Sequence, residues 1–273
     1  MPQPLPTPSH AATRASSLSV VIVAKNEARN IAECVASAAF ADEVLVLDSG
    51  STDATAALAL EAGARVVQTR GWPGYGPQVA RGFTLAASTW VLSLDADERI
   101  TNELREEVLA VTHLEGNEAL DGYRIPRLSE FCGEFVHHSG WRPDDTLRLG
   151  KRALSGFTDH FLHAHMTVNG RVGRLRASLI HFSYPDIDDV MDKLVRYSSG
   201  HARDMLAAGK TASLSKAVLH GLGAFLRTYV LRLGFLDGQR GLMIAIYNAE
   251  YTYYKYIKLM MLQSPPKRPE FRA

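Results

Sequence analysis

The stretch LSVVIVAKNEARNIAECVASAA (residues 18–39) decides the fold class of this chain. Its first seven residues form a continuous, β-branched apolar run, which is typical of a buried strand. The residues that follow place Ile31, Cys34 and Val35 at helical spacing. The same alternation continues with expected strands over 42–50, 65–69 and 90–94 and expected helices over 51–64 and 79–87. Strands that alternate with helices predict an α/β protein with a mostly parallel sheet and right-handed crossovers.

Polar residues follow the expected strands at the points where they end. Lys25 to Glu27 come after the first strand, Asp48 closes the second, and Asp95, Asp97 and Glu98 follow the apolar run 90–94. Parallel sheets bind ligands beyond the carboxyl ends of their strands, so these side chains are expected on one rim. Carboxylates two residues apart can hold a divalent cation, and oxygen ligands favour Mg²⁺ or Mn²⁺. An isolated pair of this kind is more often a solvated turn.

The composition excludes several classes of protein. With 46% hydrophobic and 22% charged residues the chain is globular, and its net charge of +1 argues against a generally nucleic-acid-binding surface. Its two cysteines, Cys34 and Cys132, lie far apart, which suits a reducing compartment and predicts a cytoplasmic location. Residues 1–17 carry four prolines and are expected to be a disordered tail. No run of 18 apolar residues is present, so any contact with a membrane is expected to be peripheral.

Four segments together resemble a known family. SVVIVAKNEARNI (19–31), VLDSGSTDAT (46–55), GYGPQVARGFTLA (74–86) and VLSLDADERI (91–100) are similar to the nucleotide-sugar domain of family 2 inverting glycosyltransferases, which have the GT-A fold. Four later segments resemble the small glucosyltransferases that extend the inner core of bacterial lipopolysaccharide. They are HSGWRPDDTLRL (138–149), VNGRVGRL (168–175), LIHFSY (179–184) and GAFLRTYVLRLGFLDGQRG (223–241).

The resemblance implies a UDP-sugar donor such as UDP-glucose, Mg²⁺ or Mn²⁺, and a saccharide or lipid-linked acceptor in lipopolysaccharide biosynthesis. It also implies roles for individual positions, each of which has a plainer structural alternative such as a surface cation or a helix cap. By this resemblance, Ala24, Lys25 and Glu27 border the nucleotide base, Asp48 binds the base or ribose, Arg81 borders the donor, Asp95 lies near the ribose and donor sugar, and Asp97 binds the metal.

The resemblance does not identify the base that deprotonates the acceptor as directly as it identifies the donor and metal residues. The family often has a glutamate after a histidine, but in FLHAHM (161–166) Ala164 occupies that position. We favour Asp144, because SGWRPD joins an aromatic, a cationic and an acidic residue suited to holding a sugar against Trp141. Asp145, Asp159, His163 and His165 remain alternatives.

The last third of the chain has a different character. Residues 187–208 predict an amphipathic helix, and a helix is also expected over 242–262. The helix expected over 213–234 carries one broad apolar face made of Leu214, Val218, Leu222, Phe225, Leu226, Tyr229, Val230 and Leu233. Such helices could lie in the interface of the cytoplasmic membrane or pack on the catalytic domain or another subunit, so oligomerisation is also open.

The expected organisation has four parts. They are a tail (1–17), a GT-A catalytic domain (18–185, with a nucleotide-sugar half over 18–113 and an acceptor half over 114–185), a helical region (186–262) and an exposed tail (263–273). The predicted activity is hexosyl transfer with inversion. Transfer to another acceptor, such as polyprenyl phosphate or exopolysaccharide, is the main alternative. A metal-dependent phosphatase or a nucleotidyltransferase could use the same acids, but the first strand lacks a glycine- and lysine-rich phosphate loop.

Overall fold

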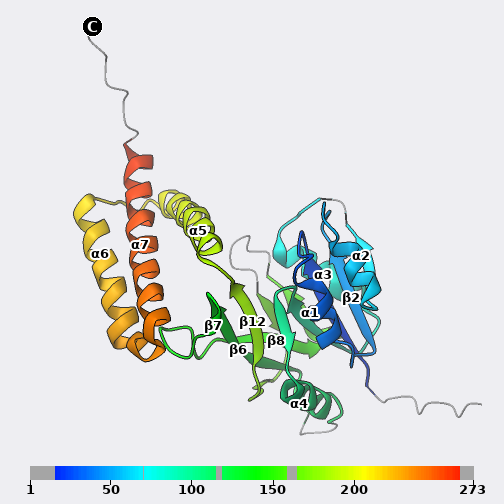
Figure 1. Cartoon of the computed structure of the whole chain (residues 1–273). Coiled ribbons are helices and arrows are strands. Elements are labelled where there is room, and N and C mark those ends of the chain that lie inside the picture. Colours follow the sequence, from blue (N-terminus) through cyan, green and yellow to red (C-terminus); the bar gives the residue numbers. More distant parts are fainter. Residues whose placement is uncertain (1–15, 70, 115–118, 159–164, 265–273) are drawn as a thin grey trace, which may run out of the picture. The chain divides into compact units, whose positions relative to one another are not determined.

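The computed structural model describes residues 16–69, 71–114, 119–158 and 165–264, and the chain divides into two compact units (Figure 1). The first unit is Met1–Ile125 with Thr146–Ser178, and the second is Pro126–Asp145 with Leu179–Ala273. Asp159, His163 and Ala164 lie outside the described residues.

The first unit is built on a doubly wound sheet. Four parallel strands lie in the order β3 (Arg65–Gln68), β2 (Glu43–Asp48), β1 (Leu18–Ala24) and β4 (Trp90–Asp95), and β8 (Asp145–Lys151) runs antiparallel to β4. In this register Ala24 lies opposite Asp48, so the strands end level with one another. The strand order reverses between β1 and β4, and a crevice at such a reversal is where open α/β sheets bind ligands.

Helices connect these strands and cover the sheet. α1 (Ile31–Ser37) and α2 (Thr55–Glu61) follow β1 and β2, and α3 (Tyr75–Leu85) leads back into β4. Right-handed crossovers place α1 and α2 on one face and α3 on the other. On the α3 face, Val79 and Phe83 pack against strand residues that include Val21. Gly82 allows this approach, because a Cβ there would lie 2.3 Å from Val21 Cγ1.

The first unit also contains shorter elements. Thr101 caps the amino-terminal end of helix α4 (Asn102–Thr112), since its side chain accepts a hydrogen bond from the Leu104 N–H at 3.1 Å. The elements are β5 (Glu98–Ile100), α4 (Asn102–Thr112), the beginning of β6 (Gly122–Phe131) paired in parallel with β11 (Val172–Arg174), the 3₁₀ turn Arg152–Leu154, and the antiparallel pair β9 (Ser155–Phe157) and β10 (Met166–Val168).

The second unit combines a small sheet with long helices. The end of β6 pairs with β12 (Leu179–Tyr184) and β7 (Glu134–Phe135). The helices are α5 (Ile187–Ala207), α6 (Leu214–Leu226), its π-helical continuation (Arg227–Leu231), the 3₁₀ turn Gly234–Asp237 and α7 (Gly238–Gln263). None of the helices in the described ranges is long and apolar enough to cross a membrane.

An aromatic core holds this second unit together. Phe131 and Ile244 are fully buried, and the rings of Trp141 and Tyr184 lie against Phe131 with 5.7 Å between ring centroids in each pair. Residues before position 146 thus pack with residues after 178. The second unit therefore includes residues from the segment that the sequence analysis assigned to the acceptor half.

Four helix boundaries differ clearly from the expected ones: α3 begins at Tyr75 rather than at residue 79, α7 begins at Gly238 rather than at residue 242, and two others differ for identifiable reasons. α2 begins at Thr55 rather than near residue 51, because Ser51, Thr52 and Asp53 form loop contacts instead of a first helical turn. The helix expected over 213–234 ends its α-helical part at Leu226, and Leu233 adopts a left-handed conformation with a φ of 55°.

Candidate active site

The loops after β1 and β2 are joined to each other at the carboxyl edge of the first unit's sheet. Asn26 has a φ of 56°, and its backbone N–H donates to Ser51 Oγ at 2.9 Å. Its side-chain oxygen accepts from the Thr52 N–H at 2.9 Å, and the Glu27 N–H donates to Thr55 Oγ1 at 2.8 Å. These hydrogen bonds hold the two loops in one conformation beside the end of the sheet.

Asp48 lies at the base of these loops. It is only 1% exposed, and it accepts hydrogen bonds from both the N–H and the hydroxyl of Ser51. Ala24 is buried beside it, whereas Lys25 is exposed at the start of the β1 loop. The sequence predictions at Ala24, Lys25, Glu27 and Asp48 therefore fall on one continuous part of the rim.

A buried charge cluster lies where β4 ends. Arg148 of β8 donates from Nη2 to Asp95 Oδ2 at 2.6 Å and to Glu98 Oε1 at 2.8 Å. Tyr75 donates its hydroxyl proton to the other oxygen of Asp95, and the Asp95 N–H donates to Glu98 Oε2 at 2.9 Å. Each oxygen of both carboxylates therefore has a donor.

The electrostatics of this cluster fix its protonation states. Burial opposes the charge on Arg148, but Asp95 and Glu98 outweigh it and raise the pKa of the guanidinium. Burial, together with Asp95, raises the pKa of the Tyr75 hydroxyl well above its ordinary value. Tyr75 therefore remains a proton donor to Asp95, and Arg148 remains a cation.

Asp97 is held differently from its two acidic neighbours. It lies with Ala96 in the turn between β4 and β5 and is half-buried, whereas Glu98 is fully buried. A cation placed directly on Asp95 or Glu98 would lie beside the guanidinium of Arg148, which contacts both carboxylates. The Asp97 carboxylate is an oxygen donor of the kind that Mg²⁺ or Mn²⁺ prefers. In the described part of the chain, no three His, Cys, Asp or Glu side chains form a metal cluster.

Arg81 reaches the same edge from α3. It is exposed, and its Nη1 donates to Gln78 Oε1 at 3.2 Å. Gln78 is fully buried, and its Nε2 donates to Ser49 Oγ at 3.1 Å and to the Thr69 hydroxyl. Gln78 thus ties α3 to the residues that follow β2 and β3, and it orients Arg81.

Sequence reasoning missed Tyr75, Gln78 and Arg148. Arg148 had a usable signal, because a charged residue within the apolar strand sequence LRLG (147–150) requires a buried partner. Tyr75 and Gln78 gave no comparable signal, since they lie before the helix expected over 79–87, in a segment that contains Gly74 and Gly76.

The candidate bases lie elsewhere in the chain. Asp144 belongs to the second unit, where its Oδ2 accepts from Arg127 Nη2 at 2.7 Å and from Nε at 2.9 Å. Asp145 is half-buried next to it, and His165 is exposed in the first unit. The ring of Trp141, which was expected to hold a sugar, packs within 5.7 Å of Phe131 and 5.6 Å of Tyr184 in the aromatic core.

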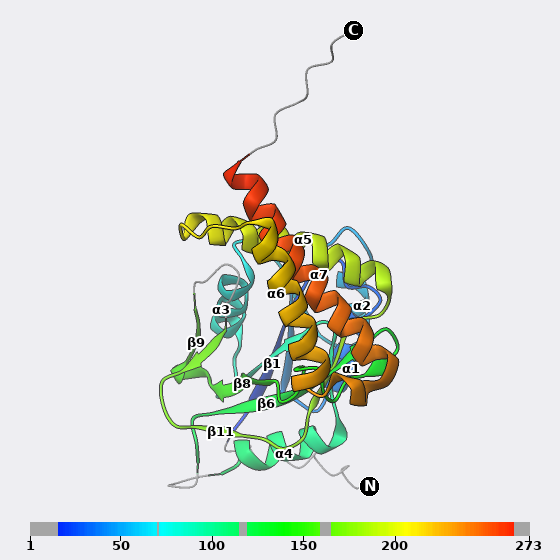
Figure 2. The same ribbon diagram turned by 90° about the vertical axis from the view of Figure 1, so that its left-hand side faces the viewer.

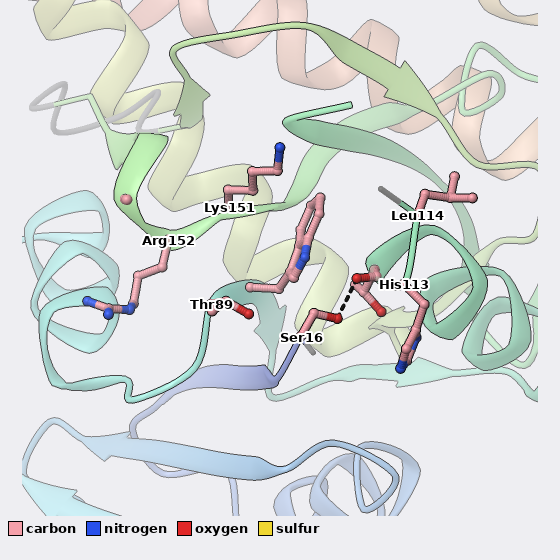
Figure 3. A pocket seen from close by; sticks show the side chains of 9 residues that line it. Ser16, Thr89, His113, Leu114, Lys151 and Arg152 are labelled. Carbon is pink, nitrogen blue, oxygen red and sulfur yellow. Dashed lines mark hydrogen bonds between the residues drawn. The ribbon is translucent and has the colours of Figure 1, made fainter. Parts of the chain in front are cut away.

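A separate cavity lies at the opposite, amino-terminal edge of the first unit's sheet. Figure 3 shows Lys151 and Arg152 on one side of it and His113 and Leu114 on the other. Its volume is about 400 Å³, and Trp90 forms part of its wall. Among the described residues, the lining contains cations but no carboxylate, and it therefore differs from the donor set of the carboxyl-edge site.

The sequence of the amino-terminal part of the chain identifies the family. Residues 19–171 match the family model described as "Glycosyl transferase family 2", and the chain belongs to this family. It is therefore a family 2 glycosyltransferase. The expected fold class, a GT-A α/β domain with a mostly parallel sheet followed by C-terminal helices, is confirmed.

Relatives of similar length carry related names. An uncharacterized glycosyltransferase of Rickettsia felis is 27% identical and covers 89% of each chain. The lipopolysaccharide core biosynthesis glycosyltransferase LpsC of Rhizobium meliloti is 28% identical over 92% of this chain and 95% of its own.

Solved structures resemble the chain more distantly. S. aureus TarS (residues 1–349) has a TM-score of 0.48 and 16% identity over 92% of each chain. Glucosyl-3-phosphoglycerate synthase from Mycobacterium tuberculosis, solved with Mn²⁺, UDP and glucosyl-3-phosphoglycerate, has a TM-score of 0.40 and 24% identity over 51% of this chain and 58% of its own.

Proposed function

We propose that the protein transfers a hexose from a UDP-sugar, with UDP-glucose as the first candidate, to a saccharide or lipid-linked acceptor in lipopolysaccharide core biosynthesis. The observation that carries this proposal is the carboxyl-edge rim, where Asp48, Asp95 and Asp97 lie around the reversal between β1 and β4. The similarity to LpsC supports the choice of acceptor, and the synthase solved with UDP supports the choice of donor.

We assign the donor contacts as follows. Ala24, Lys25 and Glu27 border the uracil, and the buried carboxylate of Asp48 accepts hydrogen bonds from the base or ribose. Arg81, oriented by Gln78, places a cation where the diphosphate carries negative charge. Asp95 is held by Tyr75 and Arg148 near the ribose and the donor sugar. A fixed constellation of this kind orients the sugar without reorganisation during the reaction.

Asp97 is the proposed ligand of a Mg²⁺ or Mn²⁺ ion. The bound ion would supply charge stabilisation for the diphosphate leaving group. The ion pairs from Arg148 to Asp95 and Glu98 fix both ends of the turn that carries Asp97. Arg148 thereby positions the Asp97 carboxylate without touching the substrate.

For the base we propose Asp144. Both hydrogen bonds from Arg127 end on Oδ2, so Oδ1 is the oxygen that would take the proton of the acceptor hydroxyl. In the transfer, the acceptor oxygen forms a bond to C1 of the sugar, the bond from C1 to the UDP oxygen breaks, and the proton moves to the carboxylate. Asp144→Asn would remove this acceptor of the proton, and Asp145→Asn is the matched comparison.

The central test of the proposed function is Asp97→Asn. With UDP-glucose and Mn²⁺, we expect this variant to lose turnover by about 100-fold or more and to lose the thermal stabilisation that donor and metal give together. Asp192→Asn is the matched control, because Asp192 is an exposed carboxylate of α5. Full turnover by the Asp97 variant would contradict the proposal. So would phosphate release from simple monoesters without sugar transfer.

A further inference from the structure

Helix α6 packs on α7 through small side chains. Ala217, Gly221, Ala224 and Thr228 are the buried residues of α6 and its π-helical continuation. A Cβ at Gly221 would lie 3.2 Å from the Ala249 carbonyl oxygen, so the two backbones approach closely. The two helices lie side by side in both views (Figures 1 and 2). Because small residues form this contact, the largest apolar side chains of α6 are not buried in it.

The large apolar side chains of α6 point the other way. Leu219, Leu222, Leu226 and Val230 are 66%, 59%, 56% and 49% exposed, and we call these four residues the α6 outer face. Their spacing of three, four and four residues places them in one line along the helix. Exposed apolar residues continue beyond this face at Leu231, Leu233, Phe235 and Leu236. A contiguous apolar surface of this kind marks an interaction site.

The segment of chain that carries the α6 outer face has acidic side chains nowhere along it and several basic ones. Residues 205–236 contain Lys210, Lys216, Arg227 and Arg232 but no Asp or Glu. Lys216 and Arg227 are exposed and lie along one flank of the outer face. An apolar stripe with cations beside it has the pattern of a helix that lies in the plane of a membrane interface.

The same charges disfavour a second copy of this chain as the partner. In a two-fold antiparallel contact centred on Leu222, Lys216 of one copy would lie opposite Arg227 of the other. Like charges brought together at the edge of an interface oppose its formation. Anionic lipid headgroups, in contrast, complement all four cations.

We propose that the α6 outer face binds the surface of an anionic lipid bilayer. Its leucines enter the boundary between headgroups and acyl chains, and Lys216 and Arg227 contact the headgroup charge. An apolar groove of about 420 Å³ between α6 and α7 adjoins this face at Val218, Leu222 and Phe225, with Glu250 at its wall. The groove extends the apolar surface that the lipid covers. This inference is independent of the donor, the metal and the base.

The apolar contribution is tested with the double variant Leu222→Glu and Leu226→Glu. We expect cosedimentation of the full chain with mixed phosphatidylcholine and phosphatidylglycerol vesicles to fall by about tenfold or more. The matched control is Leu60→Glu in α2, because Leu60 is 64% exposed but belongs to the first unit. The control should bind vesicles as the unchanged protein does. Because all three leucines are exposed, circular dichroism melting should show each variant folded.

The charge contribution has its own variants. Lys216→Gln and Arg227→Gln should each lower binding to the mixed vesicles by about fivefold. Arg176→Gln, a change at an exposed arginine of the first unit, is the control and should have no effect. Pure phosphatidylcholine vesicles should bind the unchanged protein much more weakly than the mixed vesicles.

Three results would overturn the proposal. The first is unchanged vesicle binding by the Leu222 and Leu226 double variant. The second is equal binding to charged and uncharged vesicles. The third is a dimer in analytical ultracentrifugation that the same double variant dissociates, because the α6 outer face would then be covered by a second copy.

Discussion

Helices α3 and α6 use the same kinds of residues in opposite directions. In α3, Val79 and Phe83 face the protein interior, and Gly82 lets the helix pack closely against the sheet. α6 turns Ala217, Gly221 and Ala224 into the protein and leaves its leucines outside. The first arrangement buries large apolar side chains away from water, which is the main stabilising contribution in a water-soluble domain.

The difference shows that an apolar helix face does not by itself say what covers it. In α3 the face with the largest side chains is the face that touches the protein. In α6 the protein contact is made by close approach of two backbones, as in helix pairs that are stable in lipid. The position of the small residues is therefore the more informative observation.

The largest expected effect on stability comes from removing a buried arginine of the first unit, compared with removing an exposed arginine beside the α6 outer face. Arg148→Met leaves the fully buried carboxylate of Glu98 and the partly buried one of Asp95 without their cation, which should lower the free energy of unfolding by about 3–5 kcal/mol. Arg227→Met makes the same change at an exposed arginine beside the α6 outer face and should alter it by less than about 0.5 kcal/mol. Urea denaturation measures both, and equal effects would show that the cluster at Asp95 is not a structural centre.

A smaller effect is expected for glycines in the two helices. Gly82→Ala forces a methyl group against Val21 and Leu47 and should destabilise the protein by about 1–3 kcal/mol. Gly223 has nothing within 4 Å of an added Cβ, so Gly223→Ala should stabilise the protein by about 0.5–1 kcal/mol through helix propensity. Thermal melts with opposite signs of change would support the two modes of packing. A stabilising Gly82→Ala would contradict the close contact of α3 with the sheet.

The smallest expected effect is a difference in the rate at which the two cysteines, one in each unit, are alkylated. Burial raises the pKa of the Cys34 thiol strongly, and Cys34 Sγ donates to the Asp95 carbonyl oxygen at 3.4 Å. Burial also raises the pKa of Cys132, but this residue is partly exposed. Alkylation at a pH of about 8 should therefore label Cys132 first and Cys34 only on unfolding. Mass spectrometry of the native protein measures the labelling of each site. Similar labelling rates for Cys34 and Cys132 would contradict the prediction.

Most of the parallel sheet was predictable because its information is local. The run over 18–24 is apolar and β-branched throughout, and β1 has the same bounds. The rim acids were predictable for a related reason, since a carboxylate directly after a buried strand lies at the edge of the sheet. Glu98 proved to be a structural acid, fully buried against Arg148.

The partners of those acids were not predictable from local sequence. Arg148 reaches Asp95 from 53 positions away, on a strand that runs antiparallel to β4. The apolar face expected on the helix over 213–234 was also incomplete as a prediction. Periodicity located Leu222 and Leu226 on one side, but the protein contact lies on the side of Ala217 and Gly221.

The aromatic core of the second unit has a consequence for the order in which the chain is synthesised. Phe131 and Trp141 emerge from the ribosome early, but Tyr184 and Tyr247, which complete their packing, follow much later. At a rate of roughly 5–20 residues per second, the interval of about 100 residues between Trp141 and Tyr247 takes on the order of 5 to 20 s. During this time the nascent chain carries Phe131 and Trp141 without the later residues that complete their packing. A chaperone that acts on this protein during translation would therefore find its binding site at residues 126–145.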